Sequence, residues 1–346
     1  MPQLPEMVQA LLDPKAYPHP AQRVEMVQTQ MSFVFLAGDY VYKVKKPVNL
    51  GYLDYTTLDK RHFYCQREVE LNQRLCPDAY LGVVPITRDR GDILIEGRGE
   101  VIEYAVKMRY LPQEAMLNVL LANNQVSVEM ITSVAKRLVE FHQKAETISG
   151  FGDLDTITQN TEENFDQTIK YIGNTISQEK YQHIKDYTNS FIENNASLFR
   201  KRIADGKIRD CHGDLHAAHI CFFFSLKTAS SLTSRLIDGI CIYDCIEFND
   251  RFRYCDVASE VAFLAMDLDH CGRADLSRSF VDAYVAFSRD KGLLQLLNYY
   301  KCYMAYVRGK VESFKLDDPY ISDEEKTKTL AVAKRYFELA ESYAKT

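Results

Sequence analysis

The 346-residue sequence changes character near Val128. Before that point, short runs of β-branched and aromatic residues surround one long amphipathic segment, and after it helical patterns dominate. Strands gathered in one half of a chain and helices in the other predict an α+β fold. We therefore expect a small β-rich N-terminal lobe over residues 1–110. A larger helical C-terminal lobe is expected over residues 111–346, with a helical insertion at about 151–202.

The N-terminal half predicts a sheet and one helix. Gly38-Asp39 is a turn signal between two β-rich runs, so these form a hairpin. Thr57 is a good N-cap for a helix that ends near Leu75. Glu68 lies on the apolar stripe of this helix and needs a partner there, whereas Glu70 lies on the solvent side. The strands are expected at residues 32–37, 40–45, 82–86, 93–95 and 101–108.

Composition excludes several classes of protein. A formal net charge of -6 argues against a general nucleic-acid binder, which needs a basic surface. No run of eighteen apolar residues predicts a membrane-spanning helix. The N-terminus lacks the pattern of a signal peptide, and the nine cysteines show no pairing pattern. These features predict a cytoplasmic protein with reduced thiols.

Two blocks of the C-terminal half carry the chemistry. The first is a His/Asp-rich loop, residues 211–220, that runs into an apolar strand; it contains Asp214 and His219. The second is an apolar strand that ends at Asp244, with Glu247 three residues later. Two adjacent antiparallel strands would gather these four side chains around one point, and clustered carboxylates suit Mg²⁺. An Asp at the end of a strand is also a common turn residue, so spacing alone leaves the metal interpretation open.

The same residues carry a resemblance to a known family. His212-Gly213-Asp214-Leu215, together with Asp244, resembles the catalytic loop and metal-binding Asp of the aminoglycoside phosphotransferase family. These are small-molecule kinases with a protein-kinase-like, two-lobed fold. The resemblance covers most of the chain. More narrowly, the chain resembles uncharacterised bacterial members of the family, some of which continue into a P-loop ATP-binding domain. Because the sequence contains no G-x-x-x-x-G-K-[ST] motif, no such domain is expected here.

The resemblance implies roles for individual residues. Asp214 is implied to accept the proton of the attacking hydroxyl, and Asp244 to hold Mg²⁺ on the ATP phosphates. Lys43 is implied to bind the α- and β-phosphates and to be held by Glu68. Lys45 lies on the same strand face and is the alternative choice. The remaining nucleotide contacts implied are Ser32, at the position of the nucleotide-covering turn, and Met108 and Tyr110 in the segment that matches the inter-lobe hinge.

Three features depart from the family pattern. His219 stands where the family usually has a metal-binding Asn, and imidazole prefers softer metals than Mg²⁺. His219 is therefore a weak metal ligand, a phosphate hydrogen-bonding group or a sign of lost activity. Glu247 is either a compensating metal ligand or a salt-bridge residue. The turn Thr29-Gln30-Met31-Ser32 lacks the glycines of a phosphate-covering loop.

The sequence thus predicts an ATP- and Mg²⁺-dependent phosphotransferase acting on a small-molecule hydroxyl. The alternative is a catalytically silent nucleotide-binding protein, a pseudokinase, that regulates a protein partner. A third interpretation keeps the chemistry but transfers phosphate or a nucleotidyl group to protein. All three share one fold, because fold does not settle function.

Overall fold

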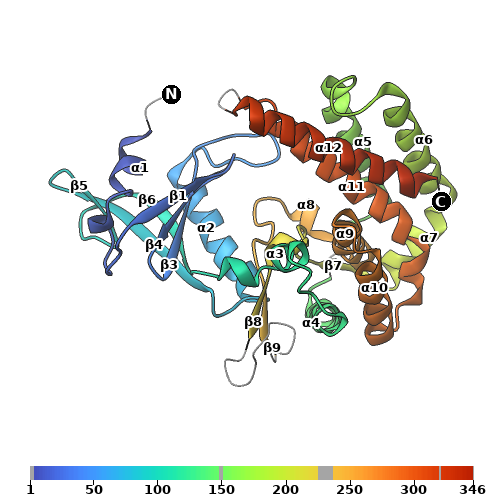
Figure 1. Cartoon of the computed structure of the whole chain (residues 1–346), viewed down its shortest axis with the longest axis horizontal. Coiled ribbons are helices and arrows are strands. Elements are labelled where there is room, and N and C mark those ends of the chain that lie inside the picture. Colours follow the sequence, from blue (N-terminus) through green and yellow to red (C-terminus); the bar gives the residue numbers. More distant parts are fainter. Residues whose placement is uncertain (1–3, 148–150, 225–236, 319–320, 346) are drawn as a thin grey trace. The chain divides into compact units, whose positions relative to one another are not determined.

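The computed structural model describes residues 4–147, 151–224, 237–318 and 321–345 (Figure 1). These residues form two compact units. The described residues of unit 1 are 4–119, 219–224 and 237–250. Those of unit 2 are 120–147, 151–218, 251–318 and 321–345. The first unit thus extends past residue 110 and takes in the strand-forming parts of both chemistry-bearing blocks.

Unit 1 is built on a six-stranded antiparallel sheet with the strand order β1-β2-β3-β6-β4-β5 (Figure 1). The predicted hairpin is confirmed, and Gly38 takes the positive φ of +61° that its turn requires. The sequence analysis did not anticipate β1, in which only Val24 and Met26 alternate as partly buried apolar residues before the exposed Val27. The strands are β1 (Val24–Gln28), β2 (Ser32–Ala37), β3 (Tyr40–Lys45), β4 (Tyr80–Asp89), β5 (Asp92–Ile95) and β6 (Glu100–Arg109).

One long helix of unit 1, α2 (Leu58–Gln73), packs against β4 and β6. The Thr57 hydroxyl accepts the backbone N–H of Lys60 and caps the helix as predicted. The buried face of α2 includes Cys65, Glu68 and Leu71, so the predicted stripe is confirmed. Glu70 is exposed, which confirms it as a surface charge.

Two later strands complete unit 1. β8 (Ile220–Phe224) pairs antiparallel with β9 (Ile237–Ile242), in a register that sets Cys221 opposite Cys241. The antiparallel pair that the sequence predicted between the two blocks is therefore present. A short 3₁₀ turn, η4 (Ala217–His219), precedes β8.

Unit 2 is helical apart from two short paired strands. Its aromatic-rich core includes Phe165, Phe263, Tyr306 and Phe337. The segment expected as a helical insertion forms α5, α6 and most of α7. A capping box between Ser322 and Glu325 opens the last helix. The principal elements are α4 (Val128–Lys144), α5 (Leu154–Thr168), α6 (Gln178–Asn194), α7 (Ala196–Ala204), β7 (Ile208–Asp210), β10 (Tyr254–Asp256), α9 (Val257–His270), α10 (Ala274–Ser288), α11 (Leu297–Lys315) and α12 (Asp323–Ala344).

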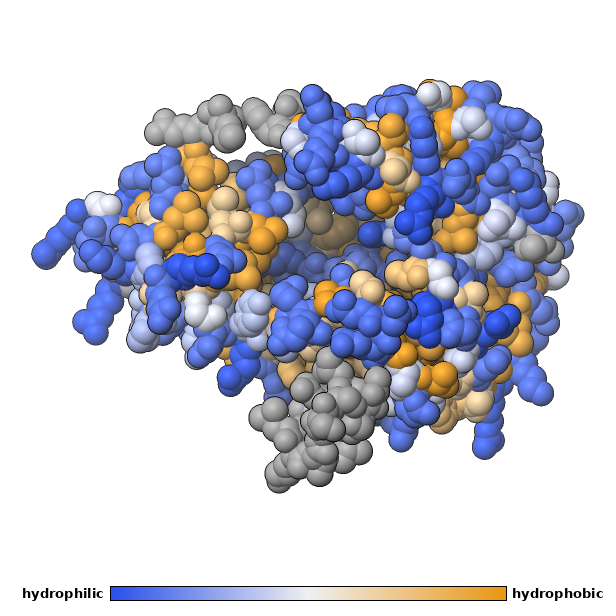
Figure 2. Space-filling model, in the orientation of Figure 1, coloured by the Kyte–Doolittle hydropathy of each residue, from blue (hydrophilic) through white to orange (hydrophobic). Residues whose placement is uncertain are grey.

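The shorter elements lie mainly at the ends of the larger ones. They are α1 (Glu6–Ala10), η1 (Pro14–Ala16), η2 (Gln113–Ala115), α3 (Leu117–Ala122), η3 (Ile169–Tyr171), α8 (Asp250–Arg253) and η6 (Lys291–Gln295). Hydrophilic side chains cover most of the face drawn in Figure 2. Among the described residues, no helix combines the length and the apolar character that crossing a bilayer requires.

Candidate active site

Three predicted site residues converge in unit 1. Lys43 on β3 donates a hydrogen bond from Nζ to Asp244 Oδ1 at 2.6 Å. The same Nζ lies 2.9 Å from Glu68 Oε1 on α2. Lys43 and Asp244 are 201 positions apart in the chain, so only the folded structure brings them together. The resemblance predicted this ordered Lys, Glu and Asp set, and the structure places the three side chains in contact.

The second lysine of β3 is held more tightly than the first. Lys45 donates to Glu68 Oε2 at 2.6 Å and forms a short hydrogen bond with Glu247 Oε1. The Tyr55 hydroxyl donates to the same Glu247 oxygen at 2.5 Å, and Lys45 Nζ lies 4.9 Å from the centroid of the Tyr55 ring. The side chain of Lys45 is 1% exposed, against 18% for Lys43. Of the two lysines, Lys43 is therefore the one that solvent or a ligand can reach.

These groups stay ionised although they are buried. Burial alone would lower the pKa of Lys43, but Asp244 and Glu68 raise it well above its usual value. Lys45 is raised in the same way by Glu247 and Glu68, again against the effect of burial on its pKa. Burial would raise the pKa of Glu68, but the two ammonium groups lower it. Two ammonium groups thus face three carboxylates, and the cluster keeps an excess negative charge.

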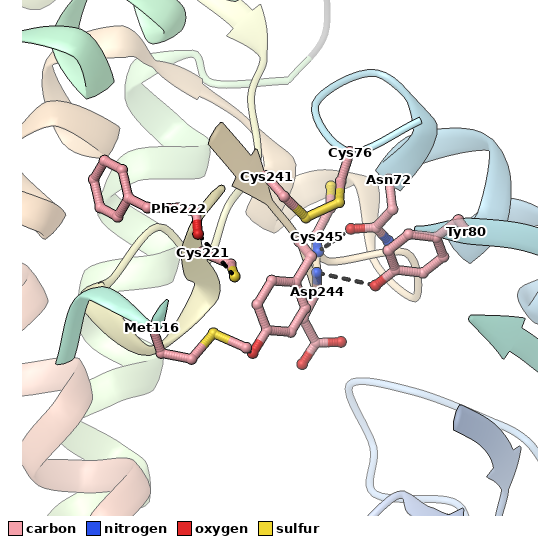
Figure 3. The surroundings of a disulfide bond; sticks show 10 residues. Asn72, Cys76, Tyr80, Met116, Cys221, Phe222, Cys241, Asp244 and Cys245 are labelled. Atoms are coloured by element: carbon pink, nitrogen blue, oxygen red, sulfur yellow. Dashed lines mark hydrogen bonds between the residues drawn. A yellow bond between two sulfur atoms is a disulfide. The ribbon is translucent and has the colours of Figure 1, made fainter. Parts of the chain in front are cut away.

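The backbone around Asp244 is held by α2 and β4 (Figure 3). The Asp244 N–H donates to the Tyr80 hydroxyl at 3.2 Å, and the Cys245 N–H donates to Asn72 Oδ1 at 2.9 Å. Asp244 has φ +63°, the left-handed conformation that a residue other than glycine or asparagine seldom adopts. Such backbone strain is concentrated at functional sites, where surrounding contacts maintain it. The Asp244 side chain is 39% exposed, and its Oδ2 lies 3.6 Å from His219 Nε2.

A disulfide lies beside this segment and corrects the expectation of fully reduced thiols. Cys76, just after α2, is bonded to Cys241 on β9, and their Cα atoms are 4.6 Å apart (Figure 3). The sequence analysis expected reduced thiols, Cys241 among them. Because 165 residues separate the two cysteines, no spacing pattern could reveal the pair. The other seven cysteines are free.

The remaining predicted nucleotide contacts lie in unit 1 at different depths. Ser32 is 2% exposed, and its N–H donates to the Thr29 hydroxyl within the turn before β2. Met108 is buried in the cluster that includes Cys65 and Tyr80. Tyr110 is 40% exposed, and its N–H donates to Asp39 O. Only Tyr110 offers a largely accessible side chain.

The loop that carries Asp214 belongs to unit 2, where one buried carboxylate holds its backbone. Glu260 Oε1 accepts the N–H groups of His212 and Gly213 at 2.6 and 2.8 Å. Glu260 Oε2 lies 2.5 Å from His142 Nε2, and His142 Nδ1 lies 2.8 Å from the Tyr284 hydroxyl. Burial would raise the pKa of Glu260, but these hydrogen bonds and the neighbouring imidazoles lower it.

Sequence reasoning missed Glu260. Asp256, which lies just before α9, is the N-cap of this helix and makes a bidentate contact with Arg202. The signal for Glu260 was present, since it is a carboxylate inside an apolar helical run, as Glu68 is in α2.

Other polar side chains surround the Asp214 loop in unit 2. His216 Nε2 lies 3.7 Å from Asp214 Oδ2. Asp267 Oδ2 accepts the Ala217 N–H at 2.8 Å, so this carboxylate also fixes the loop backbone. Asp214 itself is partly exposed, as a residue that meets a substrate must be.

Comparison with known proteins defines the fold class. The structure is similar to an amicoumacin kinase solved with AMP-PNP, Ca²⁺ and Ami, with a TM-score of 0.54, 11% identity and coverage of 97% of this chain and 94% of that chain. It is also similar to a choline kinase from Cryptosporidium parvum Iowa II, with a TM-score of 0.51, 11% identity and coverage of 98% and 93%. The chain therefore has the protein-kinase-like α+β fold of small-molecule kinases.

Relatives found by sequence come from two mycobacterial species and are described as uncharacterised proteins. Proteins of Mycobacterium tuberculosis and Mycobacterium bovis are 32% identical to this chain over 293 residues, which is 84% of the chain. The chain spans 54% of the length of these relatives. No family model matches the sequence.

Proposed function

We propose that this protein is a phosphotransferase that moves the γ-phosphate of ATP to a hydroxyl of a small molecule, with Mg²⁺ as cofactor. The observation that carries the proposal is the Lys43–Glu68–Asp244 constellation on the kinase-like fold. Phosphoryl transfer needs little covalent chemistry from the protein and depends on positioning and charge neutralisation. Lys43, whose side chain is mostly buried but still accessible, lies beside Asp244, a carboxylate of the kind that binds metal ions. Together they supply both.

Within this proposal, Lys43 contacts the nucleotide phosphates and Glu68 keeps its ammonium in place. Lys43 is suited to this role because its ammonium stays charged and its side chain remains partly accessible. Asp214 accepts the proton of the acceptor hydroxyl. Ser32, Met108 and Tyr110 remain the proposed nucleotide contacts, with the exposed Tyr110 ring the best placed to lie against a base.

The residues around Asp244 fit a hard divalent cation. Its carboxylate is accessible, its backbone is strained into place, and the surrounding cluster has a surplus of negative charge. Asp244 would hold Mg²⁺, with His219 beside it. A bound Mg²⁺ supplies neutralisation of the phosphate charge. Glu247 already accepts hydrogen bonds from Lys45 and Tyr55, which favours the salt-bridge alternative over a role as a metal ligand.

The alternative is a catalytically silent nucleotide-binding protein that regulates a protein partner. His219 favours it, because an imidazole replaces the family's amide ligand next to Asp244. The two proposals differ in turnover but not in binding.

The first test is the melting temperature with ATP, with and without Mg²⁺. A ligand that binds only the folded state raises the melting temperature by mass action. We expect a Mg²⁺-dependent rise in the wild type and none in Asp244→Asn. Asp54→Asn is the matched control, since Asp54 pairs with Lys60 on the exposed surface of unit 1. If the wild type shows no rise at saturating ATP and Mg²⁺, the protein is not a nucleotide-dependent enzyme.

The second test measures turnover with a panel of sugars, amino alcohols, nucleosides and aminoglycosides. Asp214→Asn should lower turnover by about 10²–10⁴-fold and leave ATP binding intact, because general base catalysis contributes that much. ATP binding without turnover of any acceptor would favour the regulatory alternative. Labelled phosphate or AMP appearing on protein would identify a protein acceptor instead.

A further inference from the structure

The two lysines of β3 make different contacts around Glu68. Lys43 lies 2.9 Å from Glu68 Oε1, but its hydrogen bond is directed at Asp244. The hydrogen bond that Glu68 receives at its other oxygen comes from Lys45. Because successive odd positions of a strand share one face, Lys43 and Lys45 both reach Glu68 from β3. Glu68 is therefore anchored by the lysine that no ligand can reach.

Lys45 also ties Glu68 to the segment that follows Asp244. Its ammonium bridges Glu68 Oε2 and Glu247 Oε1, and the Tyr55 hydroxyl donates to the same Glu247 oxygen. Glu247 is 7% exposed and Lys45 is 2% exposed. A buried carboxylate keeps its charge only when an opposite charge or hydrogen bonds compensate it. Lys45 supplies that charge to two carboxylates at once.

This arrangement has a consequence for Lys43. Without Lys45, Lys43 would be the one ammonium among the three carboxylates of the cluster, and Coulomb attraction would hold it there. With Lys45 present, its positive charge is shared by Glu68 and Glu247, so these carboxylates attract Lys43 less strongly. Lys43 is then free to exchange its contact with Asp244 for a contact with phosphate oxygens.

We propose that Lys45, clamped by Glu68, Glu247 and Tyr55, is a positioning residue that keeps Lys43 available to the nucleotide and fixes the Asp244 segment against α2. It touches neither nucleotide nor metal. The inference rests on the proposed nucleotide site, and it assigns Glu247 as the counter-ion of Lys45. Hydrogen-bonding partners of this kind, one layer behind the groups that bind a ligand, typically change affinity by about 10–100-fold when they are removed.

The test measures Mg²⁺–ATP affinity and the free energy of unfolding in four proteins. They are the wild type, Lys45→Met, the double variant Lys45→Met/Glu247→Gln and a control, Lys107→Met. Lys107 on the neighbouring strand β6 pairs with Glu96 and lies over the rings of Tyr40 and Tyr42, so the control also removes a lysine ion pair of the sheet. Among the described residues its contacts do not include Glu68 or Asp244, so the Mg²⁺–ATP affinity of Lys107→Met should equal that of the wild type.

We expect Lys45→Met to weaken Mg²⁺–ATP binding by about 10–100-fold and to destabilise the fold. The double variant removes the uncompensated Glu247 charge, so it should recover stability but not affinity. If Lys45 had only a structural role, the double variant would recover affinity together with stability. Wild-type affinity in a folded Lys45→Met protein would also overturn the inference.

A milder variant covers the case in which Lys45→Met does not fold. Glu247→Gln keeps the shape of the side chain and lets Lys45 retain Glu68. The dependence of ATP binding on Mg²⁺ should survive in this variant, and its loss would make Glu247 a metal ligand and overturn the assignment. Failure of the wild type to bind Mg²⁺–ATP would instead overturn the proposed function, and with it any positioning role for Lys45.

Discussion

The two chemistry-bearing parts of the molecule are held in place by different means. In unit 1, ion pairs between side chains position Lys43, Glu68 and Asp244. In unit 2, the loop with Asp214 is positioned through its backbone, whose N–H groups donate to Glu260. A side-chain ion pair can exchange one partner for a ligand oxygen. A carboxylate that holds backbone N–H groups fixes the path of the loop without using the Asp214 side chain.

Low pH should weaken the arrangements in both units. We expect this to be the largest effect, because acid protonates Glu68 and Glu260 together. The folded-state pKa values of Glu68 and Glu260 lie below the ordinary value of 4.5. A carboxyl with a lowered pKa contributes its full stability above its unfolded value and loses it as the pH falls through the folded value. The melting temperature should therefore fall steeply below pH 4.5. Glu260→Gln should make that fall shallower, and an unchanged pH dependence would contradict the assignment.

Removing the brace of unit 2 should have the next largest effect. Glu260→Ala leaves two buried N–H groups and His142 without their partner, at a cost of about 3–5 kcal/mol. Chemical denaturation measures this loss. Glu140→Ala on the exposed side of α4 is the control and should change stability little. A loss below about 1 kcal/mol for Glu260→Ala would show that the loop is held by other contacts.

The disulfide between Cys76 and Cys241 lies in unit 1, and the described residues of unit 2 contain none. Cys76→Ser should lower the free energy of unfolding by about 2–4 kcal/mol, since the bond closes a long loop of the unfolded chain. A thiol reductant should have the same effect on the wild type and none on the variant. Cys271→Ser, which removes an exposed free cysteine, is the control. Equal stability of oxidised and reduced wild type would contradict this prediction.

The smallest effect in this comparison of the two units is expected from the helix caps. Thr57 caps α2, which carries Glu68, whereas Ser177 caps α6 in unit 2. Alanine at either position should destabilise the fold by about 1 kcal/mol. Only Thr57→Ala should also weaken Mg²⁺–ATP binding, because α2 positions Glu68. Titration of binding in both variants checks this, and equal affinities would mean that the N-terminal turn of α2 does not influence the site.

Much of the fold could be predicted from local patterns. The β2–β3 hairpin, the Thr57 cap and the buried face of α2 were all predicted correctly, because turn chemistry and periodicity depend on neighbouring residues. Strand β1 was not predicted, because its apolar alternation is limited to Val24 and Met26 and is too short to stand out. Burial of Glu68 followed from its place on an apolar stripe, but the same argument was not applied to Glu260 in α9.

The sequence by itself determined which residue types were available: two lysines on one strand face, a carboxylate on a buried helix stripe, and an Asp at the end of a later strand. The tertiary structure decided how they are paired. It paired Lys45 with Glu68 and Glu247, and it directed the hydrogen bond of Lys43 to Asp244. It also joined Cys76 to Cys241 in a disulfide. Such pairings join residues as many as 202 positions apart. They depend on the packing of α2, β3 and β9, which no local pattern of residues encodes.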